Sequence, residues 1–358
     1  MIGPCNLRVV SIVGARPQFV KLAPMAKTFR ELGVEHKIIH TGQHYDVDMS
    51  DSFFKALGIP DPDVHLGIGS GTHGAQTGGM QAQMDQVLLD FHPDWVLVYG
   101  DTNSTIAGAL SAVKLHIPLA HLEAGLRSHN RAMAEEHNRV LTDHAADICF
   151  APSAAAVDSL IQEGLGERAL LVGDVMVDVC YFTRDAVKTS SAPLPGAEGG
   201  ERFVLCTVHR AENTDDPTRL RKILDALAEL PLPVVLPAHP RLIAKTAEFD
   251  ISLGGGSLRI VKPLGYPEMV KAITGADGVI TDSGGVQKEA YLLGTPCTTL
   301  RTETEWVETQ QGGWNLLDPD LSRLAEISLR PVPRTKRSNP YGDGTAAYAV
   351  AKALIDRS

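Results

Sequence analysis

The sequence predicts an α/β protein built from two doubly wound domains, and three observations lead to this fold. The chain has 358 residues, a length that favours two domains of ordinary size over one. Short apolar runs alternate with amphipathic helical patterns, as expected for parallel strands that are buried on both faces. Residues 190–200, rich in Ser, Pro, Gly and Ala, separate two sets of these runs and indicate a linker.

The apolar runs are the predicted strands of two sheets. The first set lies at residues 7–13, 37–40, 95–99, 117–122, 148–150 and 169–172, and the second at 203–208, 233–236, 258–261, 278–281 and 297–300. Helical patterns lie between them, for example at 76–89 and 219–230. Domain one is therefore expected to span residues 1–175 and domain two residues 201–340, with a linker region at 176–200. Residues 341–358 are expected to form a C-terminal helix that packs back on domain one.

Composition and charge exclude several classes of protein. The net charge of −10 at pH 7 argues against general nucleic-acid binding, which needs a basic face. No apolar run approaches the length of a membrane span, and the first seven residues lack the basic and apolar regions of a signal peptide. We therefore expect a cytoplasmic protein with neither a nucleic-acid nor a membrane partner.

The motifs predict neither a metal nor a cofactor. The sequence contains no HExxH and no CxxC. His36, His40 and His44 have the spacing of ligands on a helix, but 37–40 is a predicted strand, which does not align them. Residues 69–74 match GxGxxG, yet no clear strand precedes them, so a loop is expected there rather than a dinucleotide-binding turn.

Unusual polar residues follow the predicted strands of both halves. The strand ends carry residues 14–17, 41–44, 100–103, 121–127, 208–213, 238–240 and 282–285. In open α/β sheets, ligands bind beyond the carboxyl ends of the strands. Because both halves contribute such residues, we expect the ligand site in a cleft between the two domains.

Two of these strand ends have the features of phosphate-binding turns. Residues 14–17 form a glycine turn into a helix, with Arg16 and Lys21 as cations near its N-terminus. In the second motif, Gly284 and Gly285 allow backbone N–H groups to approach a diphosphate, and the Ser283 hydroxyl adds a donor. Glu289, about two turns further on, is placed to accept from ribose hydroxyls. Ordinary capped strand–helix turns are the alternative interpretation of both motifs.

Carboxylates at neighbouring strand ends suggest acid/base chemistry. Asp101 and Glu123 close adjacent predicted strands, so the two can share one edge of the sheet. Glu135 and Glu136 open a predicted helix at 135–145, where an acid can also serve only to stabilise the helix dipole. Carboxylates that converge with Arg16, Lys21 and His209 are typical of an acid/base site.

With these residues in place, the chain resembles the family of non-hydrolysing UDP-N-acetylglucosamine 2-epimerases. The resemblance extends over residues 9–344 and includes GARPQFVK (14–21), TGQHYD (41–46), GDTNST (100–105), HLEAGLRS (121–128), AEEHNR (134–139), VHRAEN (208–213), TDSGGVQKEA (281–290) and NPYGDG (339–344). It implies two Rossmann-like domains that face a cleft, a GT-B-like fold. It also implies a homodimer that acts on a UDP-sugar without a cofactor.

The resemblance implies roles for residues at matching positions. The catalytic group would be Asp101, Glu123, Glu135 and His209. The groups that bind substrate and UDP would be Arg16, Lys21, Arg139, His239, Ser283, Gly284, Gly285 and Glu289. The reaction implied is the interconversion of UDP-N-acetylglucosamine (UDP-GlcNAc) and UDP-N-acetylmannosamine (UDP-ManNAc), by elimination of UDP to 2-acetamidoglucal and its re-addition.

The chain departs from the usual family pattern at several positions. Gln18, Ala134 and Ala211 replace a glutamate, a proline and an arginine, and residues 304–308 lack the arginine that commonly follows Thr-Glu. The forms at Gln18, Ala211 and 304–308 resemble the branch that acts on UDP-2,3-diacetamido-2,3-dideoxyglucuronic acid, which is the alternative substrate. A glycosyltransferase of the same architecture and a non-catalytic UDP-sugar sensor are the remaining alternatives.

Overall fold

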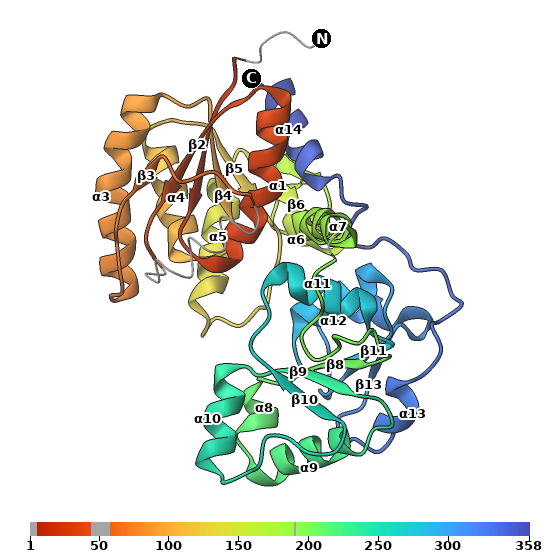
Figure 1. Cartoon of the computed structure of the whole chain (residues 1–358). Coiled ribbons are helices and arrows are strands. Elements are labelled where there is room, and N and C mark those ends of the chain that lie inside the picture. Colours follow the sequence, from red (N-terminus) through yellow and green to blue (C-terminus); the bar gives the residue numbers. More distant parts are fainter. Residues whose placement is uncertain (1–5, 44–57, 190) are drawn as a thin grey trace. The chain divides into compact units, whose positions relative to one another are not determined.

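The computed structural model describes residues 6–43, 58–189 and 191–358, which fold into two compact units (Figure 1). Unit 1 comprises Met1–Val179 and Asn339–Ser358, and unit 2 comprises Cys180–Ser338. The division falls inside helix α7 (Val175–Lys188), so half of the region expected to be a linker is helical. Its apolar residues recur at helical spacing and four of them are buried, which explains why the chain continues as a helix there.

Unit 1 contains a seven-stranded parallel sheet in the order β3-β2-β1-β4-β5-β6-β7. Its strands are β1 (Arg8–Val13), β2 (Glu35–His40), β3 (Val64–His65), β4 (Trp95–Tyr99), β5 (Leu119–Leu122), β6 (Ile148–Ala151) and β7 (Ala169–Leu171). The chain runs outward from β1 to β3 and returns to β4, which pairs with β1 on the other side. This reversal of strand order places a crevice at the carboxyl ends of β1 and β4, the usual ligand position in such sheets.

Helices cover the sheet of unit 1. They are α1 (Arg16–Leu32), α3 (His73–Phe91), α4 (Asn103–Lys114), α5 (Ala134–Ala145), α6 (Ala154–Gln162), the 3₁₀ turn η1 (Gly166–Arg168), the first part of α7, and α14 (Ala346–Asp356). In α3, Met80, Met84 and Leu88 recur every four residues and are fully buried in the core. The C-terminal helix α14 packs against α1.

Unit 2 repeats the architecture with a six-stranded parallel sheet, in the order β10-β9-β8-β11-β12-β13. Its strands are β8 (Val204–Thr207), β9 (Val234–Pro237), β10 (Leu258–Val261), β11 (Gly278–Thr281), β12 (Cys297–Thr299) and β13 (Asn315–Leu317). Its helices are α8 (Ala211–Thr214), α9 (Pro217–Ala228), α10 (Pro240–Glu248), α11 (Tyr266–Gly275), α12 (Gly284–Leu293), η2 (Val307–Gly313) and α13 (Leu324–Ser328). The order reverses between β8 and β11, so here the crevice lies at the start of α12.

Two parallel sheets flanked by helices confirm the predicted α/β fold. The predicted strands all occur, and the structure adds two short ones, β3 and β13. Among the residues that the structure describes, none of the helices has the length and apolar character needed to cross a membrane.

Candidate active site

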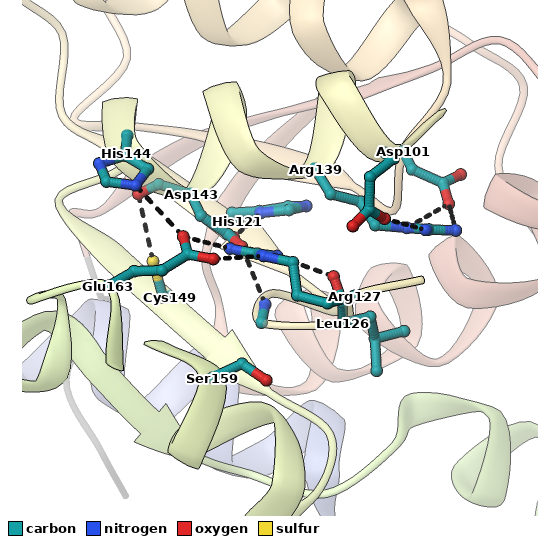
Figure 2. A network of polar contacts seen from close by, with 12 residues as sticks. Asp101, His121, Leu126, Arg127, Arg139, Asp143, His144, Cys149, Ser159 and Glu163 are labelled. Carbon is teal, nitrogen blue, oxygen red and sulfur yellow. Dashed lines mark hydrogen bonds and ion pairs between the residues drawn. The ribbon is translucent and has the colours of Figure 1, made fainter. Parts of the chain in front are cut away.

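Asp101 is the second residue after β4, in the turn into α4, and an arginine from another helix holds it (Figure 2). Arg139 of α5 donates to the Oδ2 atom of Asp101 from Nε at 2.9 Å and from Nη2 at 2.6 Å. The other carboxylate oxygen, Oδ1, makes no hydrogen bond with the described part of the chain. The side chain is 31% exposed. Asp101 therefore has one oxygen fixed by a cation and one oxygen open to a ligand.

Glu123 is the first residue after β5 and pairs with the ammonium group of Lys21 from α1. Its φ of 74° lies in the left-handed region, a conformation that costs an L-residue about 1–2 kcal/mol. Such strain concentrates at functional sites. Burial alone would lower the pKa of Lys21, but the nearby carboxylates of Glu123, Asp174 and Asp101 more than offset this and raise it. Lys21 is therefore a fixed cation among carboxylates.

The register of the sheet brings Asp101 and Glu123 to one edge. Tyr99 of β4 pairs with Leu122 of β5, so the residues that follow these partners leave the sheet at the same level. Gly100 separates the two carboxylates, and a Cβ atom there would lie 3.1 Å from Oε2 of Glu123. The structure thus brings Asp101, Glu123 and Lys21 together at this edge of the sheet, where the sequence predicts the two carboxylates.

Glu135 and Glu136 are neighbours in the first turn of α5, but their environments differ. Glu135 is exposed and makes no hydrogen bond or ion pair with the described residues. Glu136 is buried and accepts from the backbone N–H groups of Ser128 at 2.9 Å and His129 at 2.8 Å, and from Arg139 at 2.9 Å. Burial opposes its charge, but these donors prevail and lower the pKa of Glu136 to about 2. Glu136 is therefore a structural carboxylate, and Glu135 is the free one.

Arg16 and Gln18 lie at the start of α1, close to the carboxyl end of β1. Arg16 begins α1, but its side chain lies outside the described part of the structure, as do the last three residues of the TGQHYD motif (44–46). Gln18 is fully buried: its Oε1 accepts from the N–H of Gly14 at 2.8 Å, and its Nε2 donates to the carbonyl of Tyr99 at 2.9 Å. An amide both accepts and donates, so Gln18 ties the ends of β1 and β4 together in a way that a glutamate could not.

In unit 2, the buried carboxylate of Asp282, to which the sequence assigns no role, organises the turn after β8. The carboxylate of Asp282 accepts from the backbone N–H groups of His209 and Arg210 at distances of 2.9–3.1 Å. It also lies 3.3 Å from Nδ1 of His209. His239, at the start of α10, packs its ring on that of His209 with centroids 5.0 Å apart. Burial and the neighbouring His209 lower the pKa of His239.

The turn from β11 into α12 has the form expected of an anion site. The hydroxyl of Ser283 makes no hydrogen bond within the described residues, and Gly284 and Gly285 begin the helix, where backbone N–H groups lack helical acceptors. A Cβ atom on Gly284 would collide with the carboxylate of Glu305. Glu289 lies later in α12 and is half-buried. Burial raises its pKa to about 7.

Known proteins resemble this chain both in sequence and in structure. A sequence model of one protein family, described as UDP-N-acetylglucosamine 2-epimerase, matches residues 27–355. The UDP-2,3-diacetamido-2,3-dideoxy-D-glucuronate 2-epimerase of Pseudomonas aeruginosa is 44% identical over 97% of this chain and 99% of its own. A protein of Methanococcus maripaludis named as a UDP-N-acetylglucosamine 2-epimerase homolog is also 44% identical, over 97% of this chain and 99% of its own. The structure of UDP-GlcNAc 2-epimerase from Methanocaldococcus jannaschii is similar with a TM-score of 0.87 and 36% identity, covering 98% of this chain and all of that one.

Proposed function

Because the chain belongs to the UDP-N-acetylglucosamine 2-epimerase family, and is therefore an isomerase of UDP-sugars, we propose that it interconverts UDP-GlcNAc and UDP-ManNAc. The observation that carries this proposal is the pair Asp101 and Glu123. Both leave the sheet at one edge, and each is held by one cation, Arg139 or Lys21. Carboxylates that are fixed but still open to a ligand are suited to moving a proton at a sugar ring.

The chemistry of carbon 2 explains why such carboxylates are needed. That carbon bears an acetamido group, and its proton is barely acidic. Removal of the proton becomes feasible if the C1–O bond to UDP breaks in the same step, because the electron pair of the C–H bond then forms the C1–C2 double bond of 2-acetamidoglucal. Return of a proton to the opposite face of carbon 2, with re-addition of UDP at carbon 1, gives the epimer. Two acid/base groups are required, one for each face.

We assign proton transfer to Asp101, Glu123 and Glu135. The free Oδ1 of Asp101 and the exposed carboxylate of Glu135 support this assignment, since neither is committed to a protein donor. Lys21 holds Glu123 through their ion pair and supplies positive charge near the reacting groups. In unit 2, we assign His209 and His239 to contacts with the substrate. We assign the turn from Ser283 to Glu289 to the binding of UDP. The open hydroxyl of Ser283 and the helix start at Gly284 support this part.

The diacetamido uronate is a second candidate substrate, and the segment around Trp306 favours it. This tryptophan replaces the arginine common in the family, and its Nε1 would lie 3.1 Å from a Cβ atom on Gly284. The altered residue therefore lies against the turn that we assign to UDP. The relative from Pseudomonas aeruginosa, named for that substrate, is 44% identical.

Proton NMR of the purified protein with each UDP-sugar in turn tests the proposal. We expect conversion of UDP-GlcNAc to a mixture of the two epimers. Turnover of the diacetamido uronate alone would replace the first candidate by the second, whereas no epimer from either sugar would contradict the proposed function.

A further inference from the structure

A buried histidine joins the ends of the two strands that carry Asp101 and Glu123. His121 of β5 is fully buried, so it cannot touch a substrate. Its Nδ1 lies 2.6 Å from Oδ1 of Asp143, and its Nε2 lies 2.7 Å from the carbonyl oxygen of Gly100. Gly100 immediately precedes Asp101, and His121 comes two residues before Glu123. One imidazole therefore connects both strand ends.

The two partners fix the protons on the ring. A carbonyl oxygen can only accept a hydrogen bond, so Nε2 of His121 donates to Gly100. Burial opposes the charge of Asp143, but His121 and Arg127 more than offset it and lower the pKa of Asp143. Nδ1 of His121 lies against this carboxylate, so both ring nitrogens have a polar partner.

Asp143 is itself held by two further donors, and this fixes the orientation of the His121 ring. Arg127 approaches Oδ2 of Asp143 at 2.7 Å, and the N–H of Gly125 donates to the same oxygen at 3.0 Å. Arg127 also forms a two-pronged pair with Glu163, at 2.7 and 2.8 Å. Asp143 is thus held by Arg127 and Gly125 as well as facing His121, and Arg127 links it to Glu163.

Both backbone polar groups of Gly100 are hydrogen-bonded. Its N–H donates to the carbonyl of Leu122 at 3.0 Å, and its own carbonyl accepts from His121. Gly100 and Glu123 both have left-handed backbone conformations, with φ of 62° and 74°. The direction of the Gly100 carbonyl sets the direction in which the chain enters Asp101, so loss of the His121 donor frees that peptide to rotate.

We propose that His121 is a positioning residue for the reaction, which acts through the Gly100 carbonyl to fix the placement of Asp101 relative to Glu123. This inference rests on the proposed function, in which those two carboxylates act on the sugar. A displacement of about 1 Å in a reacting group can lower a rate by roughly 10²-fold. The alternative is that the network serves only the stability of unit 1.

A matched pair of variants separates these roles. In His121→Gln the side-chain amide nitrogen can take the place of Nε2 and donate to Gly100. In His121→Asn the shorter side chain places its amide nitrogen near Nδ1, where it reaches Asp143 but not Gly100. Both variants replace the imidazole by a neutral amide. His121→Gln keeps a donor to Gly100 and gives up the contact with Asp143, whereas His121→Asn does the reverse. A loss of kcat confined to His121→Asn therefore reports the donor to Gly100.

The measurements are kcat and KM for the UDP-sugar that wild type converts, UDP affinity, and melting temperature. We expect His121→Asn to lower kcat by about 10²-fold, with KM and UDP affinity within about threefold of wild type, and His121→Gln to stay within about tenfold of wild-type kcat. Equal kcat in the two variants would overturn the role of His121, whether both match wild type or both fall. Failure of both to fold would also overturn it, because His121 would then be a requirement of the fold.

The wild-type enzyme in the same assay keeps this test separate from that of the proposed function. Wild type that produces no epimer from either UDP-sugar would overturn the proposed function, and the role of His121 with it. Active wild type with equal kcat in the two variants would overturn only the role of His121.

Discussion

Replacement of Glu135 and of Glu136 by glutamine, one at a time, should give opposite results although the residues are adjacent on α5. The pKa of Glu136 is held at about 2, against 4.5 for an unperturbed glutamate. Each pKa unit corresponds to about 1.4 kcal/mol, so the ionised side chain contributes roughly 3 kcal/mol to the free energy of unfolding at pH 7. We therefore expect Glu136→Gln to lower that free energy by about 2–3 kcal/mol.

Glu135→Gln should leave stability within about 1 kcal/mol of wild type, since it removes only an exposed acid from the first turn of a helix. Its kcat should fall by about 10²–10⁴-fold, the range for loss of a proton-transfer group. Glu136→Gln leaves Arg139 its hydrogen bonds to Asp101, so its kcat should fall less.

Urea unfolding of the three proteins at several pH values, together with steady-state kinetics at pH 7, tests this prediction. The pKa of Glu136 is lowered by folding, so its contribution is complete above pH 4.5 and is lost as the pH falls from 4.5 towards 2. The stability difference between wild type and Glu136→Gln should therefore shrink over that interval. Wild-type turnover by Glu135→Gln, or an equal loss of stability in both variants, would refute the reasoning.

Further predictions concern both units. Asp101→Asn and Glu123→Gln should each lower kcat by at least about 10²-fold while UDP affinity changes little, which kinetics and calorimetry can compare; wild-type rates in both would remove the acid/base assignment. Burial raises the pKa of Glu289 to about 7. If its carboxylate accepts from ribose, UDP should bind more weakly as the pH falls through 7. Glu289→Gln should abolish that pH dependence, which titrations of UDP from pH 6 to 8 can measure. Gly284→Ala should weaken UDP binding because the added methyl displaces the Glu305 side chain and stands beside the backbone N–H groups that begin α12; unchanged affinity would place UDP elsewhere. Activity should survive EDTA, and a loss restored by one metal would show that a metal site was overlooked.

Much of the fold follows from the sequence because buried parallel strands read as continuous apolar runs. The short strand β3 (Val64–His65) was missed because residues 60–67 are interrupted by Pro, Asp and Gly, which favour loops. Helix α7 was underestimated for the opposite reason, since the Ser-, Pro- and Gly-rich segment that suggested a linker begins only at residue 190. Composition marked the break but could not say how far the preceding helix extends.

The candidate site was predictable where function follows strand ends, and less so where it depends on side-chain direction. The carboxylates Asp101 and Glu123 close adjacent strands, which the sequence shows directly. No periodicity distinguishes Glu135 from Glu136, because adjacent residues on a helix differ by about 100° and only packing decides which faces inward. His121 and Asp143 are separated by 22 residues, and only the folded chain shows that they form one ion pair.

The most direct test of the central claim is epimerisation in deuterated water, followed by proton NMR and mass spectrometry of the product. Elimination of UDP and return of a solvent-derived proton predict that the epimer carries deuterium at carbon 2. Product that retains its original hydrogen at carbon 2 in full would contradict the proposed proton transfer by the carboxylates of unit 1.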